Sequence, residues 1–224
     1  MTTRLAPRRR RSRGISTAEL LAATGLCLII LGIAASFFTA QQRALRVQNT
    51  YAESQNVTRT FTDLIGRELR MAAYDPSETA FVPSTNMAWC PGSRPGLVVA
   101  TTNSIRFRQD LNGDGDLSDA NEDVRYGLSG NSIIRTDAVD DVPLVLVTGV
   151  PNVGLTFKYY DNQNPPVEIV GGGGTLSSGQ RDCVAKVEIS VHSSLPNPDP
   201  YSSAPLESEV RTQIALRNRS LMNF

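Results

Sequence analysis

A run of oxygen-bearing side chains in the middle of the chain has the spacing of a cation-binding loop. Residues 110–123 read DLNGDGDLSDANED, with oxygens at loop positions one, three, five and seven and glycine at position six. Twelve-residue calcium loops begin in this way, because alternate oxygen ligands wrap the ion and glycine permits the tight turn. The loop then departs from that pattern, since Asn121 stands at position 12 and a glutamate follows it. The candidate ligands are Asp110, Asn112, Asp114, Asp116, Asp119 and Glu122.

Two interpretations of this loop stay open. The flanking residues alternate like strands, and a strand–loop–strand calcium site is chemically sound because crowded carboxylates repel one another without a cation. The other interpretation is a solvated acidic hairpin loop, since Asn-Gly and Asp-Gly pairs form turns without any metal. Ca²⁺ is therefore the one cofactor that the sequence suggests.

Other classes of chemistry have little support in the sequence. His192 is the single histidine and falls on the polar phase of an expected strand, and neither a Gly-x-Ser-x-Gly elbow nor a phosphate-binding loop is present. A serine nucleophile would need that histidine together with an orienting acid. The 22 basic and 22 acidic side chains balance, which argues against a nucleic-acid partner. We predict a protein that is not an enzyme.

The first 40 residues are where charge and apolarity are most unevenly distributed. Residues 1–14 carry six arginines and no acid, whereas residues 15–40 are apolar apart from one carboxylate, Glu19. A helix of these 26 residues would be about 39 Å long, enough to cross a hydrocarbon core of ~30 Å. Arginines on one flank predict a cytoplasmic N-terminus and an exported chain beyond Arg43.

Three explanations of this segment compete. A cleaved secretory signal should have an apolar run of about 7–15 residues, and bulky Phe38 occupies the outer small position of the best cleavage candidate. A plain anchor gives no reason for Glu19, because a carboxylate in lipid costs ~2.5–3.5 kcal/mol. If the leader is cut after Gly14, Ile15 gains a charged amine, and the amine of a neighbouring chain can neutralise Glu19 in the membrane.

The sequence RGISTAELL at residues 13–21 resembles the processing motif of type IV pilins and type II secretion pseudopilins. In that family a basic leader ends in glycine, an apolar residue follows, and glutamate is fifth in the mature chain. The resemblance implies cleavage between Gly14 and Ile15 by a prepilin peptidase, followed by N-methylation of Ile15. Here Ile15 stands where phenylalanine is usual.

Two further stretches, ELRMAAYDP at 68–76 and QIALRNRS at 213–220, resemble the PilW-like minor pilins, which are related to J-type pseudopilins. This resemblance implies a structural subunit that helps to initiate pilus assembly, with major and minor pilins as its filament partners. It also implies a single pass through the inner membrane, a periplasmic head, and later a place in an extracellular pilus. The alternatives are a J-type pseudopilin of type II secretion and, from another class, a membrane-anchored calcium-dependent adhesin.

The expected fold is α+β, with a long N-terminal helix packed on an antiparallel β-sheet head, as in pilins. The expected parts are a cleaved leader (1–14), a transmembrane or filament-core helix (15–43), an amphipathic helix half (44–74) and a β-rich head (75–224). Apolar residues at mostly helical spacing predict one buried stripe, which is formed by Ala44, Val47, Tyr51, Val57, Phe61, Leu64, Ile65, Leu69 and Ala72. Alternation predicts strands near 105–108, 124–128, 132–136, 144–148, 154–160, 184–192 and 210–218.

The three cysteines divide by compartment. Cys27 falls in the apolar helix and is most simply a small apolar residue. Cys90 and Cys183 both fall in the exported head, where a disulfide between them would stabilise the fold by about 4–5 kcal/mol. The alternative is two free buried thiols.

Overall fold

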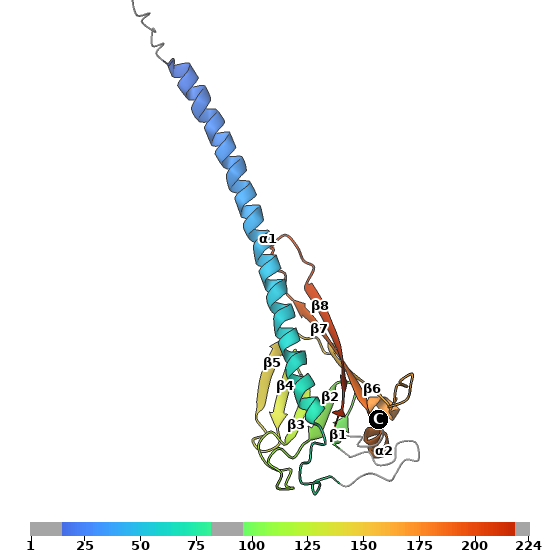
Figure 1. Ribbon diagram of the computed structural model, residues 1–224. Helices are drawn as coiled ribbons and strands as arrows, with labels where there is room; N and C mark the ends of the chain where they lie inside the picture. The colour runs from blue at the N-terminus through green and yellow to red at the C-terminus, as the bar shows by residue number, and fades with distance from the viewer. Residues whose placement is uncertain (1–14, 82–95, 218–224) are drawn as a thin grey trace, which may run out of the picture. The chain divides into compact units, whose positions relative to one another are not determined.

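The computed structural model describes residues 15–81 and 96–217, which divide into two compact units, Met1–Arg46 and Val47–Phe224. The helices are α1 (Thr17–Met71), the 3₁₀ helix η1 (Gly172–Gly174) and α2 (Ser178–Asp182) (Figure 1). The strands are β1 (Leu97–Ala100), β2 (Ser104–Arg108), β3 (Asp123–Ser129), β4 (Ser132–Asp137), β5 (Pro143–Thr148), β6 (Leu155–Tyr160), β7 (Lys186–Leu195) and β8 (Leu206–Ala215).

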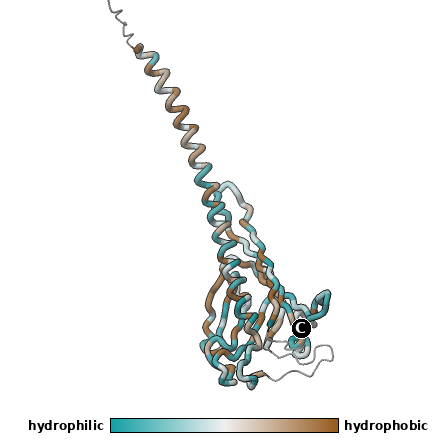
Figure 2. Tube along the Cα trace, viewed as in Figure 1, coloured by the Kyte–Doolittle hydropathy of each residue, from teal (hydrophilic) through white to brown (hydrophobic). Residues whose placement is uncertain are grey.

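The first unit consists of the N-terminal part of α1. Much of this segment is hydrophobic (Figure 2). Its apolar side chains are exposed, including Leu28 (70%), Ile29 (62%) and Phe37 (64%). Among the described residues, α1 is the one helix that is long and apolar enough to cross a membrane. A large continuous apolar surface of this kind needs lipid or protein around it.

The second unit begins with the C-terminal part of α1, which presents one face to the head. The buried positions are Thr58, Phe61, Thr62, Ile65, Gly66 and Leu69, which recur at helical spacing. Of the predicted stripe, Phe61, Ile65, Leu69 and Ala72 are buried, whereas Tyr51 and Val57 remain 38% and 39% exposed. The buried face also includes Thr58, Thr62 and Gly66, small or hydroxyl-bearing residues that an apolar pattern does not mark.

The helix ends at Met71, three residues earlier than the sequence suggests. Ala73 has a positive φ of 62°, a conformation in which an α-helix cannot continue. Its N–H instead donates to the carbonyl of Arg108, at 2.8 Å. The end of the helix is thereby attached to the end of β2.

The described strands form two antiparallel sheets, where the sequence suggested one. The first has five strands in the order β1-β2-β3-β4-β5, and the second has three in the order β6-β7-β8. The chain changes sheets after β5, where Gly149 adopts a positive φ of 75° and β6 goes on to pair with β7. The Phe157 N–H donates to the Thr102 carbonyl at 2.8 Å and connects the two sheets. The expected α+β class is confirmed, whereas β1 and α2 were not predicted.

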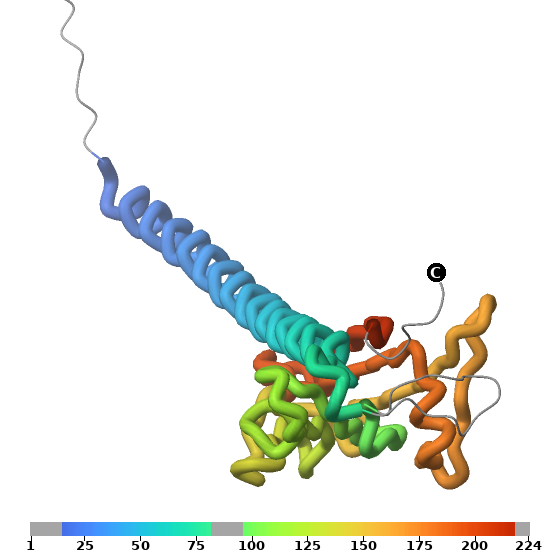
Figure 3. The backbone as a smooth tube through the Cα atoms, turned by 60° about the horizontal axis from the view of Figure 1, so that its bottom comes forward, coloured from blue at the N-terminus to red at the C-terminus, as the bar shows by residue number. Residues whose placement is uncertain are grey.

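One hydrophobic core is shared by the helix and both sheets. It contains Ile65 and Leu69 from α1, Phe107 and Tyr126 from the five-stranded sheet, and Ile189 from β7. Apolar residues of β7 alternate with more exposed ones as the sequence predicts, because one face of the strand is covered. The C-terminal turns of α1 lie along the strands in both views (Figures 1 and 3).

Candidate functional site

The first candidate site lies at the N-terminal end of α1, around Glu19. Glu19 stands in the first turn, and its Oε2 accepts a hydrogen bond from the Ser16 backbone N–H at 3.0 Å. A carboxylate is favoured here because the N–H groups of a first helical turn lack intrahelical partners and the helix dipole is positive at this end. Ser16 and Glu19 have the Ser-x-x-Glu spacing of a capping box, which is a local signal of a helix N-terminus.

Glu19 has a structural role at the helix N-terminus as well as a charge inside the apolar segment. Helix capping supplies a local reason for a glutamate in the first turn, so an anchor helix is not without one. A neutral N–H satisfies one acceptor but leaves the negative charge, which stays costly inside a bilayer. Ile15 precedes Ser16 directly and is 77% exposed, so an amine created at Ile15 would adjoin the capped turn. Gly14 lies outside the described residues.

The second candidate site is the acidic loop between β2 and β3. The structure brings two of the six predicted ligands into the protein interior, since Asp110 is fully buried and Glu122 is 1% exposed. Asp110 accepts the N–H groups of Gly113 (2.6 Å) and Gly115 (3.0 Å). Glu122 Oε1 accepts the N–H of Leu111 at 2.8 Å.

The other four predicted ligands lie on the exposed side of the loop. Asn112 Nδ2 donates to Asp114 Oδ2 at 3.0 Å and to Asp119 Oδ2 at 2.7 Å. The Asp116 carboxylate accepts both the hydroxyl and the N–H of Ser118, and these bonds lower its pKa. Within residues 15–81 and 96–217, no three Asp, Glu, His or Cys side chains are gathered closely enough to hold a metal as they stand. The loop therefore brings the side-chain oxygens of Asp114 and Asp119 to the same Asn112 nitrogen. The described residues do not form a complete set of metal ligands in this conformation.

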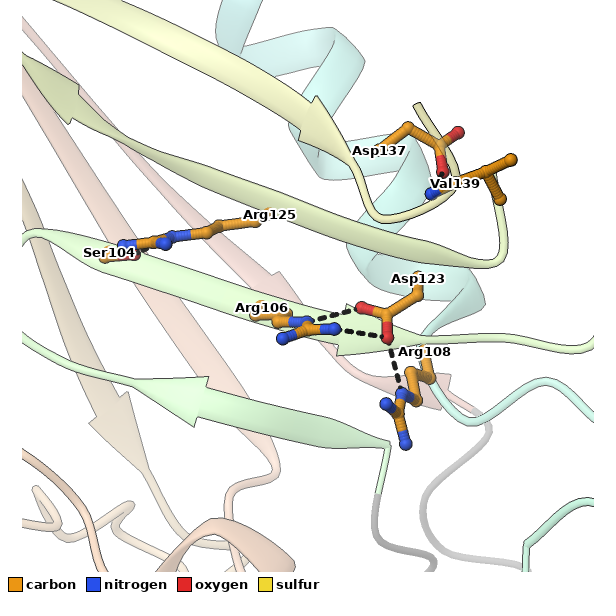
Figure 4. Close-up of polar contacts among 7 residues, drawn as sticks. All are labelled: Ser104, Arg106, Arg108, Asp123, Arg125, Asp137 and Val139. Carbon is orange, nitrogen blue, oxygen red and sulfur yellow. Dashed lines mark hydrogen bonds and ion pairs between the residues drawn. The ribbon is translucent and has the colours of Figure 1, made fainter. Parts of the chain in front are cut away.

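Asp123, which directly follows the loop, is a buried carboxylate with two arginine partners. Asp123 is 3% exposed and accepts hydrogen bonds from Arg106 (2.6 and 2.8 Å) and from Arg108 (2.7 Å) (Figure 4). Burial opposes its ionisation, but these two arginines outweigh burial and hold the pKa of Asp123 below its usual range. Two arginines thus compensate the charge of Asp123. Among the described residues, the ion pairs include none to Asp110 or Glu122.

The remaining predicted residues are placed as follows. Cys183 is buried at the C-terminal cap of α2, whereas Cys90 lies outside the described residues, so the disulfide stays a prediction. Cys27 lies in the exposed apolar part of α1. His192 lies on β7 opposite Glu209 of β8.

Comparisons with known proteins find a likeness among solved structures. No protein-family model matches the chain, and no curated protein matches it. Among solved structures, the chain is similar to a type IV-like pilin from Thermus thermophilus, with 9% sequence identity and a TM-score of 0.40. The match covers 74% of this chain and 97% of that one. At this level the likeness does not decide function, which has to be argued from the residues of the chain itself.

Proposed function

We propose that this chain is a filament subunit of the type IV pilin kind, and specifically a minor pilin that takes part in assembly. The observation that carries the proposal is the position of Glu19, in the first turn of a long apolar helix and next to the Gly14–Ile15 junction. Cleavage at that junction by a prepilin peptidase would place a charged amine four residues before the carboxylate.

Capping by the Ser16 N–H leaves the negative charge of the Glu19 carboxylate in place. An ionised carboxylate in the hydrocarbon region costs ~2.5–3.5 kcal/mol on insertion scales, and a neutral N–H does not remove that cost. An amine on the mature N-terminus of a neighbouring subunit would convert the lone charge into an ion pair. The exposed apolar side chains of the same segment, such as Leu28 and Phe37, would pack against neighbouring helices. Assembly thus removes both the unpaired charge and the uncovered apolar surface.

The long, loop-rich head favours a minor subunit over a subunit that is copied thousands of times. A J-type pseudopilin would use the same N-terminal chemistry, so deletion phenotypes separate the two. Loss of surface pili and of pilus-dependent motility supports the minor pilin, whereas loss of exported enzymes with intact pili supports the pseudopilin.

The decisive experiment replaces Glu19 by alanine and, as a matched control, the exposed Glu53 of the same helix. Mass spectrometry of the membrane-extracted wild-type protein is expected to show a chain that begins at Ile15. We expect Glu19→Ala to be cut at the same place and to stay out of sheared filaments, while Glu53→Ala is cut and incorporated normally.

Two results would overturn the proposal. One is a mature wild-type chain that begins anywhere other than Ile15. The other is normal incorporation of the Glu19→Ala variant into filaments. An anchored adhesin, by contrast, would keep its adhesive activity in the Glu19→Ala variant, because that activity does not depend on assembly.

A further inference from the structure

We propose that the loop between β2 and β3 binds a calcium ion, with the buried Oε2 of Glu122 as one of its ligands. The inference is independent of the proposed filament role. It rests on a buried acceptor that the described structure leaves without a donor, beside a fully buried second carboxylate.

The first step is the hydrogen bonding of Glu122. Its Oε1 accepts the N–H groups of Leu111 (2.8 Å) and Asn112 (3.4 Å), so the carboxylate lies against the first residues of the loop. Its Oε2 is buried and has no hydrogen-bond partner among the described residues. A carboxylate oxygen buried without a partner is costly, and some group absent from the protein chain is expected to satisfy it.

The second step is the charge around it. Asp110 is also fully buried, and its two oxygens accept only N–H groups of the loop and the hydroxyl of Ser77. Asp110 Oδ1 accepts a single N–H and Glu122 Oε2 accepts none among the described residues, so each of these two oxygens keeps a lone pair for a cation. The ion pairs recorded for residues 15–81 and 96–217 include none to Asp110 or Glu122, whereas neighbouring Asp123 binds two arginines. Among the described residues, two buried acids are therefore left without a counter-charge.

Either a cation or a proton could satisfy the unpartnered Oε2 of Glu122. A proton on Glu122 would have to be donated to a nearby acceptor, and the side-chain oxygen of Gln109 is a candidate because it is also buried without a partner. The amide of Gln109 cannot turn around to supply a donor, since its Nε2 already donates to the Asn121 carbonyl at 2.7 Å. Such a proton would satisfy Glu122 and Gln109 but leave the charge of Asp110 uncompensated, whereas a cation would neutralise Asp110 as well and draw in the exposed carboxylates.

The exposed side of the loop can complete the shell. Asp114 and Asp119 both accept a hydrogen bond from the same Asn112 nitrogen, so their carboxylates already converge on one atom. A ligand set made of carboxylate and amide oxygens from a flexible loop suits Ca²⁺, which accepts six to eight oxygens in irregular geometry. Mg²⁺ is a poorer match because it requires near-ideal octahedral coordination.

Contacts outside the loop hold it in place. Gly113 and Gly115 adopt positive φ angles of 81° and 82°, and a Cβ on Gly115 would lie 2.6 Å from the Thr79 hydroxyl. The single hydroxyl proton of Ser77, in the segment that follows α1, is shared between Asp75 Oδ1 at 3.1 Å and Asp110 Oδ2 at 3.4 Å. Ion binding should therefore stabilise the head as a whole and be visible in thermal unfolding.

The test uses the full chain in detergent, melted in EGTA, in 1 mM CaCl₂ and in 1 mM MgCl₂. For a dissociation constant of about 0.1 mM, Ca²⁺ should raise the melting temperature by about 3–6 °C, with a smaller effect of Mg²⁺. Glu122→Gln should abolish the rise, and Glu168→Gln, at an exposed glutamate elsewhere in the head, should keep it.

Asp114→Ala is a second variant that keeps the test decisive if Glu122→Gln does not fold, because Asp114 is exposed and outside the core. It should weaken or abolish the calcium shift. No shift of the wild-type protein in Ca²⁺ would overturn the proposal and leave a protonated Glu122 as the explanation. An undiminished shift in Asp114→Ala, a shift that remains in Glu122→Gln, or an equal shift in Mg²⁺ would overturn it as well.

Discussion

Besides the shared core, a largely buried polar network centred on Glu68 joins α1 to the five-stranded sheet, and removal of Glu68 tests how much this network stabilises the head. Glu68 Oε2 accepts the Tyr126 hydroxyl at 2.7 Å, and its carboxylate also receives Arg135 Nε at 3.2 Å. The Glu68 and Arg135 side chains are 20% and 13% exposed. Burial, with a further contribution from Glu68, raises the pKa of Tyr126, so its hydroxyl is a donor throughout the neutral pH range.

Glu68→Ala leaves a buried phenol and a largely buried guanidinium without their acceptor. Removing one partner of a fully buried pair costs about 3–5 kcal/mol, and we take the lower end because some water reaches this pair. Arg135 also keeps a hydrogen bond to Asn121 at 2.7 Å. A loss of roughly 3 kcal/mol corresponds to a fall in melting temperature of about 6–12 °C for a chain of this size.

The assay is thermal unfolding of the full chain in detergent, followed by circular dichroism. The matched control is Glu209→Ala, which removes another glutamate–arginine pair, this time one whose side chains are 45% and 66% exposed. Exposed pairs contribute little, so this variant should melt close to the wild type. Glu68→Gln should fall between the two, because it keeps an acceptor for Tyr126 and loses the charge. If Glu68→Ala melts together with Glu209→Ala, the buried network does not stabilise the head and the reasoning is wrong.

Three further predictions use the same melting assay. The pKa of Asp123 is held below its unfolded value of about 4, so its contribution to stability is complete above that pH and is lost as the pH falls through the folded pKa; Asp123→Asn should flatten the dependence of the melting temperature on pH below about pH 4. Gly96→Ala would place a Cβ 2.5 Å from a backbone nitrogen at the end of α1 and should cost about 1–3 kcal/mol, whereas Gly172→Ala, where a Cβ meets nothing within 4 Å, should be nearly neutral. If Cys90 and Cys183 form the predicted disulfide, reduction should add about 2 Da to the intact mass and cost about 4–5 kcal/mol of stability; two free thiols in the oxidised protein would contradict it.

Much of the local structure could be read from the sequence, because side-chain periodicity reports which face of an element is covered. The alternation of Val187, Ile189 and Val191 identified a strand with one buried face, and β7 has that pattern. The apolar run after Glu19 likewise predicted a helix long enough to cross a membrane. The capping role of Glu19 was readable too, since Ser-x-x-Glu is a local signature.

The tertiary structure alone decided the features that join distant segments. Glu68 meets Tyr126 and Arg135 across 58 and 67 residues, and no local period specifies which strand a helix residue will face. The division into two sheets depends on which strand β6 pairs with after the chain turns at Gly149, a choice made by packing.

The acidic loop shows the same division between local and long-range information. Its composition predicted turns and oxygen ligands. The burial of Asp110 and Glu122, however, depends on β2, β3 and the segment after α1, which enclose them. The sequence shows which side chains carry charge, whereas the tertiary structure determines which of those side chains are buried from water.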